Sequence, residues 1–237
     1  VAIQNVTLTS SMSLDLGSSS VTMGDFTMTD INAAGITIDG GSTGSTQSTV
    51  YSFTDISIGE LVHLYDLDQT SSSVFRNITI FNSGSYGLRL GDLNPNNAIV
   101  IEDVTINVTA NYGLSMYNVN PDIEFLNLNV QGSSGTDQFH ATGSPGNLTL
   151  RNSTIANALG NNLRGIHALA TNMLTLDNVT VSRNAVRTSL FSDLAAGVYA
   201  TNLTIINSNI SDNYNLPTYT GNSLSNSDIY CAGVYAT

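Results

Sequence analysis

The sequence repeats one eight-residue pattern nine times along its length. The first copy spans residues 1–8 and reads apolar-x-apolar-x-Asn-apolar-x-apolar. Copies recur about every 25 residues, a period typical of solenoids, in which each turn of chain stacks on the one before. The copies span residues 1–8, 21–28, 51–58, 73–80, 99–106, 123–130, 148–155, 174–181 and 203–210.

The fifth residue of every copy is Asn or Asp. Side chains alternate between the two faces of a strand, so the apolar residues on both sides of this position point the same way. Asn and Asp also tolerate the left-handed backbone conformation that a sharp bend requires. We therefore expect two short strands joined at a one-residue corner, and stacked corners whose amides hydrogen-bond along the molecule. The predicted corner ladder is Asn5, Asp25, Asp55, Asn77, Asp103, Asn127, Asn152, Asn178 and Asn207.

A third apolar-x-apolar segment follows each pair of strands, and Gly opens six of the nine copies. A corner that needs positive φ would explain these glycines. Three strands in each period predict an all-β fold, a right-handed parallel β-helix (β-solenoid) with three faces and about nine rungs. We expect one such domain over residues 1–237, with Phe53 and Phe75 stacked in its core.

The composition excludes several classes of partner. The 237 residues include six Lys and Arg in total, 18 acidic residues and a net charge of −12. A chain without a basic patch cannot neutralise phosphates, so nucleic acid and anionic membrane surfaces are unsuitable partners. No apolar run is long enough to enter a membrane, and no signal-peptide pattern is present. The low charge and the many Ser, Thr, Asn and Gly residues favour an extracellular or cell-surface protein.

The Asx corners and segments such as residues 203–210, Leu-Thr-Ile-Ile-Asn-Ser-Asn-Ile, resemble the pectate-lyase-like superfamily of right-handed parallel β-helices. The resemblance covers the whole chain and implies its architecture. That superfamily includes polysaccharide lyases, hydrolases, surface adhesins and structural fibres, so the resemblance leaves the function open. It implies that a carbohydrate ligand would lie on the outward face of the third strands.

The outward residues of the third strands form the most informative column. All three histidines of the chain belong to it, together with one arginine and two tyrosines. The simple explanation is that polar and aromatic residues suit a pleated surface. The alternative is a carbohydrate-binding groove made by His63, Arg89, His140, His167, Tyr199 and Tyr235. The full predicted column is Asp15, Thr37, His63, Arg89, Ser115, His140, His167, Tyr199 and Tyr235.

Catalysis is a weaker hypothesis for this column. Stacking would place His140 beside His167, and Asp137 and Arg164 each lie three residues earlier. A histidine could act as a base and Tyr199 as an acid in β-elimination or hydrolysis. Glycoside hydrolysis normally needs two carboxylates, and the column itself offers only Asp15.

Two segments around these residues have a partial family likeness. Residues 135–137, Gly-Thr-Asp, are similar in part to the Asn-Thr-Asp element of polygalacturonases. Residues 165–167, Gly-Ile-His, are similar in part to the Gly-His-Gly element of that family. The Arg-x-Lys element of the family is impossible here, because the chain has no Lys.

Neither a cofactor nor a metal site is predicted. Calcium would need an acidic cluster, for which Glu60, Asp66 and Asp68 near His63 are the best candidates, although a solvated turn is the better explanation of them. Asn-x-Ser/Thr sequons occur at four corner asparagines and at four other positions. If the protein is eukaryotic and secreted, the expected glycosylation sites are Asn107, Asn147, Asn202 and Asn209.

Both ends of the sequence lie directly next to a predicted strand. Solenoids normally need polar caps, and neither terminus shows one. Because the chain opens at Val1 without Met, we expect a mature form or an excised segment. These features favour an extracellular structural rod, a head-to-tail fibre subunit or an adhesin-type stalk, with self-association or flanking rungs covering the ends. The alternative is a carbohydrate-binding or polysaccharide-degrading β-helix.

Overall fold

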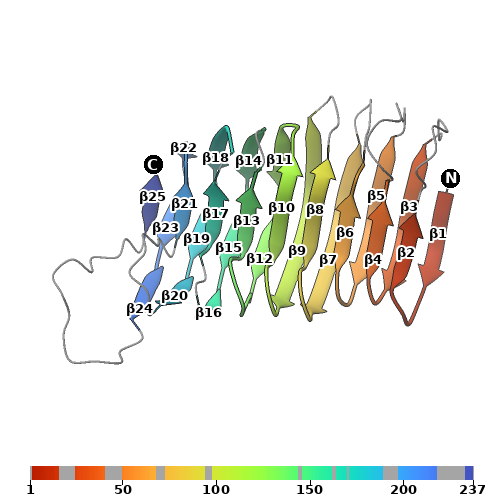
Figure 1. The fold of residues 1–237 in the computed structure, drawn as a ribbon, viewed down its shortest axis with the longest axis horizontal. Coiled ribbons are helices and arrows are strands. Elements are labelled where there is room, and N and C mark those ends of the chain that lie inside the picture. The colour runs from red at the N-terminus through yellow and green to blue at the C-terminus, as the bar shows by residue number, and fades with distance from the viewer. Residues whose placement is uncertain are drawn as a thin grey trace.

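The computed structural model describes residues 2–15, 25–40, 50–67, 73–93, 98–143, 146–161, 164–169, 171–188, 197–217 and 233–236. These residues form an all-β parallel solenoid, a rod along which the strands follow one another from the N-terminus to the C-terminus (Figure 1). Two large parallel sheets make up the rod. No helix in the described part of the chain is long and apolar enough to cross a membrane.

The larger sheet contains the Asx corners, and we call it the corner sheet. Its 13 strands are β1 (Ala2–Thr7), β3 (Phe26–Ala33), β5 (Tyr51–Ile58), β7 (Val74–Ser83), β9 (Ile99–Thr109), β11 (Ile123–Leu126), β14 (Asn147–Arg151), β18 (Met173–Asp177), β22 (Leu203–Ile206), β12 (Asn129–Gln131), β15 (Thr154–Ala156), β19 (Thr180–Ser182) and β23 (Asn209–Ser211).

The second sheet contains the predicted third strands, and we call it the third-strand sheet. Its nine strands are β2 (Met12–Asp15), β4 (Ile36–Asp39), β6 (Val62–Tyr65), β8 (Leu88–Leu93), β10 (Leu114–Val119), β13 (Phe139–Thr142), β17 (Ile166–Leu169), β21 (Val198–Ala200) and β25 (Val234–Ala236). A separate three-stranded sheet joins β16 (Leu159–Asn161), β20 (Ala185–Thr188) and β24 (Tyr214–Pro217). The parallel solenoid is confirmed, whereas the right hand, nine rungs and three faces stay predictions.

The corners adopt the predicted left-handed conformation. One Asx residue in each copy has a φ between 47° and 59°. Amide hydrogen bonds join neighbouring corners, for example Asn127 Nδ2 to Asp103 Oδ1 at 2.8 Å and Asn178 Nδ2 to Asn152 Oδ1 at 2.8 Å. The observed corners are Asn5, Asp30, Asp55, Asn77, Asp103, Asn127, Asn152, Asn178 and Asn207.

The second corner is Asp30, so the prediction of Asp25 is wrong. Strand β1 pairs with β3 in a register that places Ile3 beside Met28 and therefore Asn5 beside Asp30. Residues 26–33 carry the same apolar alternation as residues 21–28, and Phe26 and Ile31 are buried. The chain adopts the frame that places the first three corners an equal 25 residues apart, at positions 5, 30 and 55.

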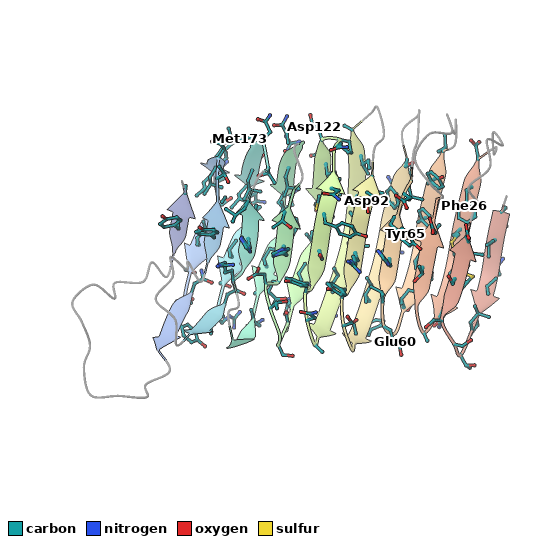
Figure 2. All side chains as sticks on the ribbon, viewed as in Figure 1. Phe26, Glu60, Tyr65, Asp92, Asp122 and Met173 are labelled. Atoms are coloured by element: carbon teal, nitrogen blue, oxygen red, sulfur yellow. The ribbon has the colours of Figure 1, made fainter. Side chains whose placement is uncertain are left out.

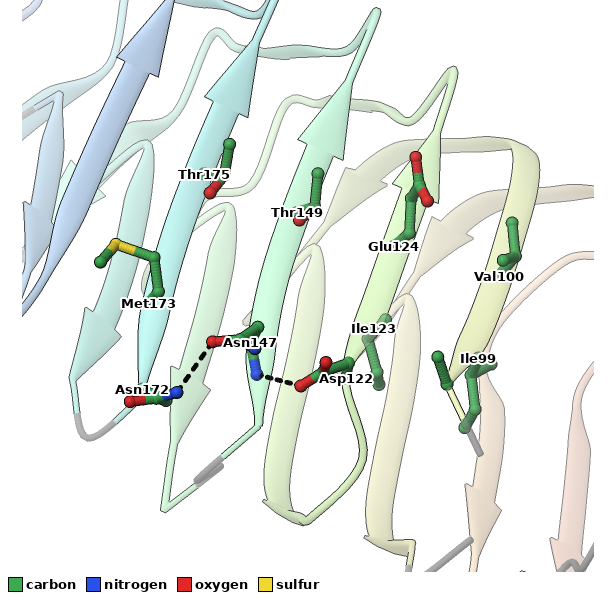
Figure 3. A pocket seen from close by; sticks show the side chains of 11 residues that line it. Ile99, Val100, Asp122, Ile123, Glu124, Asn147, Thr149, Asn172, Met173 and Thr175 are labelled. Atoms are coloured by element: carbon green, nitrogen blue, oxygen red, sulfur yellow. Dashed lines mark hydrogen bonds between the residues drawn. The ribbon is translucent and has the colours of Figure 1, made fainter. Parts of the chain in front are cut away.

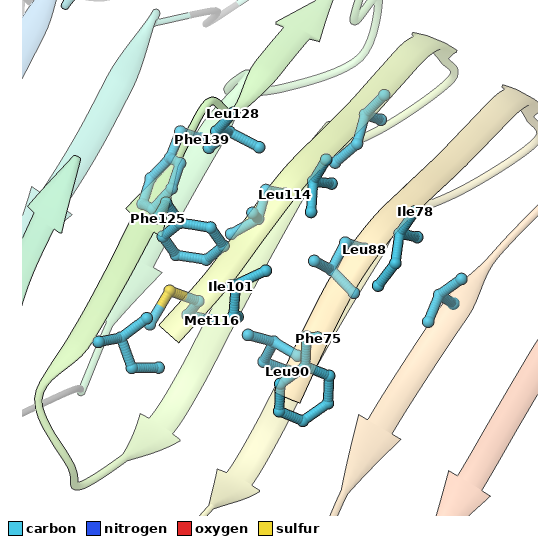
Figure 4. Packing of buried hydrophobic residues seen from close by; sticks show 14 of the residues in the cluster. Phe75, Ile78, Leu88, Leu90, Ile101, Leu114, Met116, Phe125, Leu128 and Phe139 are labelled. Carbon is cyan, nitrogen blue, oxygen red and sulfur yellow. The ribbon is translucent and has the colours of Figure 1, made fainter. Parts of the chain in front are cut away.

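The core is a set of apolar columns running along the rod between the sheets (Figure 4). Each column contains equivalent residues of successive strands, such as Phe53, Phe75, Ile101 and Phe125. Phe53 and Phe75 stack as predicted, with ring centroids 5.2 Å apart and planes 12° apart. Burying one such side chain contributes about 2 kcal/mol, and ring stacking adds ~1 kcal/mol.

The glycines that open the third strands have a different explanation from the predicted one. Among the described glycines, positive φ occurs only at Gly132 and Gly143. Close packing explains Gly113, Gly165 and Gly197, whereas a Cβ on Gly233 would meet nothing within 4 Å. A Cβ on Gly113 would lie 2.6 Å from the Gln138 carbonyl oxygen, and a Cβ on Gly165 would lie 2.6 Å from Asn184 Nδ2. Neighbouring turns therefore approach too closely for any side chain at these positions.

Candidate functional site

The predicted outward column lies on the third-strand sheet almost as expected. Along β8, Leu88 and Leu90 are buried while Arg89 between them points outward, as alternation along a strand requires. The first member of the column is wrong. Strand β2 pairs Ser13, not Asp15, with Thr37, because the frame begins at Met12. The observed column is Ser13, Thr37, His63, Arg89, Ser115, His140, His167, Tyr199 and Tyr235.

One buried carboxylate organises the centre of this face. Asp137 Oδ2 lies 2.9 Å from Nδ1 of both His140 and His167. Its other oxygen, Oδ1, accepts a 3.0 Å hydrogen bond from the backbone N–H of Arg164. The Arg164 guanidinium lies 4.9 Å from the centre of the Tyr199 ring. We call these five residues the Asp137 cluster.

The carboxylate of this cluster is held in its charged form. Burial alone would raise the pKa of Asp137, but the hydrogen bonds from His140 and His167, together with the charges of His167 and Arg164, lower it to about 2. Burial lowers the pKa of His167, although Asp137 partly opposes that shift. The cluster therefore contains one anion, one permanent cation and an imidazole that favours its neutral form.

A second group, the Arg89 cluster, contains His63, Tyr65, Tyr86, Arg89 and Tyr117. The Arg89 guanidinium lies between two tyrosine rings, 4.8 Å from the centre of Tyr86 and 4.7 Å from that of Tyr117. Tyr117 reaches across Gly91, where any Cβ would collide with its ring. Its hydroxyl lies 3.4 Å from His63 Nε2, and the His63 and Tyr65 rings stack at 4.6 Å.

The electrostatics of the Arg89 cluster differ from those of the Asp137 cluster. Burial and the nearby charge of Arg89 lower the pKa of His63 to about 4. A hydrogen bond to Asp39 raises the pKa of the Tyr65 hydroxyl to about 12, and burial raises that of Tyr117. Arg89 makes no ion pair with a carboxylate of the described residues, and its buried Nε has no hydrogen-bond partner there. His63 is therefore neutral at physiological pH, and Arg89 remains able to bind an external acceptor.

Ring contacts join the two clusters into one continuous row. Tyr86 stacks on Tyr112 at 5.4 Å, and Tyr112 contacts His140 at 4.6 Å. The row continues from His140 to His167 at 4.7 Å, from His167 to Tyr199 at 5.4 Å and from Tyr199 to Tyr235 at 5.1 Å. An aromatic and cationic strip thus follows the rod axis on the third-strand sheet.

Tyr86 and Tyr112 of this strip, and Tyr65 and Tyr117 beside it, were not among the residues predicted from the sequence. Tyr86 and Tyr112 each precede a glycine that opens a third strand, in the same place as Asp137 and Arg164. Backbone bonds align these positions, since Gly87 N donates to Tyr112 O and Gln138 N donates to Arg164 O. The detectable signal was a Tyr, Asp or Arg directly before the third strand. Tyr65 and Tyr117 lie two residues after the column and face outward by strand alternation.

Buried amides support the backbone beneath the strip. Gln138 and Asn184 are fully buried. Gln138 Nε2 donates to the Ala156 carbonyl at 2.5 Å, and Asn184 Nδ2 donates to Asn213 Oδ1 at 2.9 Å. Asn184 Oδ1 in turn accepts from the Ala158 backbone N–H at 3.2 Å. These bonds fix the turns just inside Asp137 and Arg164, because a buried amide left unpaired is costly.

The structure does not assemble the acidic calcium candidates. Asp68 lies outside the described residues. Glu60 lies at the lower edge of the rod in Figure 2, away from Tyr65, which directly precedes Asp66. Within the described ranges, the one group of three or more potential metal ligands is Asp137, His140 and His167. The calcium hypothesis therefore has no support at Glu60, Asp66 and His63.

The catalytic roles stay predictions. The proximity expected of Asp137, Arg164, His140 and His167 is observed. Asp137 is the only carboxylate in this cluster among the described residues, and both of its oxygens already accept hydrogen bonds. A pair of free carboxylates, which most glycoside hydrolases use, is not present at this point of the face.

The surface of the corner sheet has a different character (Figure 3). A shallow groove crosses β9, β11, β14 and β18, where Asn147 N–H donates to Asp122 Oδ1 at 2.7 Å and Asn172 Nδ2 donates to Asn147 Oδ1 at 2.9 Å. Its polar groups therefore bond largely to each other.

Asn147 is a predicted glycosylation site, and it is half-buried like Asn107, whereas Asn202 and Asn209 are exposed. Glycosylation stays a prediction.

Searches against protein-family models, curated proteins and solved structures give no match for this chain.

Proposed function

We propose that the protein is an extracellular β-solenoid that binds an extended polysaccharide along its third-strand sheet. The observation that carries this proposal is the unbroken row of ring contacts from Tyr86 to Tyr235, with Arg89 and Arg164 stacked against it. A row of this kind matches a linear ligand that lies parallel to the rod.

Ring chemistry supports a glycan as that ligand. Sugar rings present apolar C–H faces and polar hydroxyl edges, and aromatic side chains with a polar tip suit both. Strands in one sheet repeat about every 4.8 Å, so the strip offers equivalent contacts at regular steps. The side chains of His140 and His167 are 17% and 13% exposed, so each contributes a small part of the outer surface of the strip.

The position of Arg89 indicates which class of polysaccharide should bind. Arg89 lies between Tyr86 and Tyr117 without a carboxylate partner among the described residues. A guanidinium in a fixed orientation recognises a carboxylate through two parallel hydrogen bonds. We therefore expect acidic polysaccharides to bind more tightly than neutral ones, despite the net charge of −12.

The proposal includes the finer architecture inferred from the repeat: a right hand, nine rungs, three faces and membership of the pectate-lyase-like superfamily. Nine strands in the third-strand sheet and nine Asx corners support the count. The three-stranded sheet of β16, β20 and β24 supports a third face toward the C-terminal end. The proposal includes no catalytic step, because the Asp137 carboxylate is fully engaged by its neighbours.

Binding to a defined glycan panel tests the proposal. Polygalacturonate and alginate represent acidic chains, and a neutral β-glucan serves as the comparison. We expect Tyr199→Ala and Arg89→Ala to weaken binding at least about fivefold, because each removes a ring or cation contact of ~1 kcal/mol. Arg76→Ala is the matched control, since Arg76 is an exposed arginine on the corner sheet paired with Glu102 at 2.6 Å.

Two results would overturn the proposal. One is the absence of binding to every glycan of the panel by the folded wild-type protein. The other is an Arg76→Ala variant that loses as much affinity as Arg89→Ala, because binding would then depend on overall charge and not on the strip.

A structural stalk is the second candidate, and the rod shape of the molecule favours it (Figure 1). Self-association of such rods, as in a head-to-tail fibre, stays a prediction because it concerns contacts between chains. Negative-stain electron microscopy tests it: a fibre predicts particles much longer than one chain. Uniform particles of single-chain length would contradict the fibre and leave the glycan proposal unaffected.

A further inference from the structure

Three potential metal ligands converge on one point of the third-strand sheet. One ligand atom each from Asp137, His140 and His167 lies within 4.8 Å of the other two. The two histidines are direct neighbours in adjacent strands β13 and β17. Asp137 is only 3% exposed, and its backbone position is fixed by the stacked turns around it. The sequence therefore holds the three groups in place before any ligand arrives.

No single protonation state of His167 Nδ1 satisfies both of its close polar contacts. His167 Nδ1 lies 2.9 Å from Asp137 Oδ2, a contact that requires a proton on the nitrogen. The same Nδ1 lies 2.9 Å from Arg164 Nη1, a contact that requires a free lone pair, because arginine can only donate. One nitrogen cannot meet both requirements. Either two N–H groups or two lone pairs face each other in the cluster.

We propose that Asp137, His140 and His167 bind a divalent first-row transition-metal ion, with Zn²⁺ as the probe. A cation between Asp137 Oδ2 and the imidazole nitrogens would use all three lone pairs at once and remove the conflict. The proposal stands on this ligand geometry and does not rest on polysaccharide binding.

The donor set decides the class of metal. Two imidazole nitrogens and one carboxylate suit Zn²⁺, Fe²⁺, Co²⁺ or Ni²⁺, whereas Ca²⁺ and Mg²⁺ prefer oxygen ligands. Three protein ligands leave at least one coordination position open for water or for a ligand oxygen. His140 and His167 are partly exposed and Asp137 is buried, so the site lies just beneath the surface of the strip.

Arg164 is the resident cation that a metal ion would replace. Its Nη1 lies 3.7 Å from Asp137 Oδ2, while its Cζ lies over the Tyr199 ring. The guanidinium can move outward along that ring when a metal ion enters. The hydrogen bond to Asp137 Oδ1 would remain, because it comes from the backbone N–H of Arg164 and not from the side chain. Removing the Arg164 side chain should therefore preserve or tighten metal binding.

Isothermal titration of the tag-free, metal-stripped full chain with Zn²⁺ tests the proposal, with Co²⁺ absorption as a spectroscopic readout. We expect one equivalent to bind, and His140→Ala or His167→Ala to weaken affinity at least about tenfold. His63→Ala is the matched control, because His63 occupies the same column without a carboxylate in direct contact and should leave affinity unchanged. Arg164→Gln should bind Zn²⁺ as tightly as wild type or more tightly.

Several results would overturn the metal site. They are the absence of Zn²⁺ binding by wild type at millimolar metal, an unchanged affinity in His140→Ala, and a loss in Arg164→Gln as large as that in His140→Ala. Circular dichroism verifies the fold of each variant. If His167→Ala does not fold, Asp137→Asn provides the second ligand variant, and it too must lose affinity.

Discussion

The Asp137 cluster and the Arg89 cluster use the same residue types on the same sheet, yet they are organised differently. Both combine histidine, arginine and tyrosine. In the Asp137 cluster a buried carboxylate draws two imidazoles to one oxygen. In the Arg89 cluster two tyrosine rings enclose the guanidinium, and His63 contacts a phenol.

The difference shows what one buried charge does to a polar column. Asp137 orients its neighbours through charged hydrogen bonds, which are strong and directional. Arg89 is held by ring contacts, which are weaker and tolerate small movements. We therefore expect the Asp137 cluster to be the more rigid and the more sensitive to substitution.

Removing the carboxylate should have the largest effect. Asp137→Ala leaves the Arg164 amide and two imidazoles without their shared acceptor, and we expect a loss of about 3 kcal/mol in the free energy of unfolding. Urea denaturation measures it. Asp177→Ala is the control, since Asp177 is a partly exposed carboxylate 3.5 Å from Arg151 and should cost under about 0.5 kcal/mol. Equal losses would contradict a special role for Asp137.

The next largest effect should come from Gly→Ala substitutions, which add a methyl group beside each cluster and should destabilise the two clusters to different extents. Gly165→Ala would place a Cβ 2.8 Å from the Gly197 carbonyl oxygen and against Asn184, so we expect a loss of about 2 kcal/mol. The nearest atoms to a Cβ in Gly91→Ala belong to the Tyr117 side chain, which can swing away, so we expect a loss of about 1 kcal/mol. Gly84→Ala has open space and is the control. Thermal melting ranks the three, and a reversed order of Gly165 and Gly91 would refute the rigidity argument.

The ring enclosure of Arg89 should contribute less. Arg89→Gln removes two cation–π contacts, and we expect about 1 kcal/mol of destabilisation. Arg76→Gln removes an exposed ion pair and should cost under about 0.5 kcal/mol. Chemical denaturation of both variants measures the difference, and identical midpoints would show that the two rings do not stabilise the guanidinium.

The smallest effect is a pH dependence from His63. Its pKa falls from 6.5 to about 4 on folding, so the unfolded chain binds the extra proton between these values. Stability from this group is therefore complete above pH 6.5 and is lost as the pH falls toward 4. Because His63 is only half-buried, we expect about 1 kcal/mol after allowance for solvent screening. Denaturation at pH 7 and pH 4.5 should show a smaller acid-induced loss in His63→Gln; an equal loss in both proteins would contradict this assignment.

Much of the architecture could be predicted from the repeat, because alternation and Asx corners act within a few residues. The exact position of the second copy of the repeat could not be predicted, because residues 21–28 and 26–33 both fit the pattern. Only pairing with the neighbouring strands selects Asp30 as the corner. The same frame problem placed Asp15 in the outward column where Ser13 belongs.

The site was only partly visible in the sequence. The column of histidines followed from strand alternation, and the stacking of successive turns placed His140 beside His167. The tyrosines at positions 86, 112 and 117 did not, because their contacts depend on how far each ring reaches across neighbouring strands. The role of the opening glycines was also hidden, since it is set by backbone approach between turns and not by local conformation.

A crystal structure of the protein with a bound acidic oligosaccharide tests the central claim most directly. The account predicts a sugar chain parallel to the rod, with its rings against Tyr112 and Tyr199 and a carboxylate at Arg89. Density for the sugar in the groove across β9, β11, β14 and β18, with the third-strand sheet free, would contradict it.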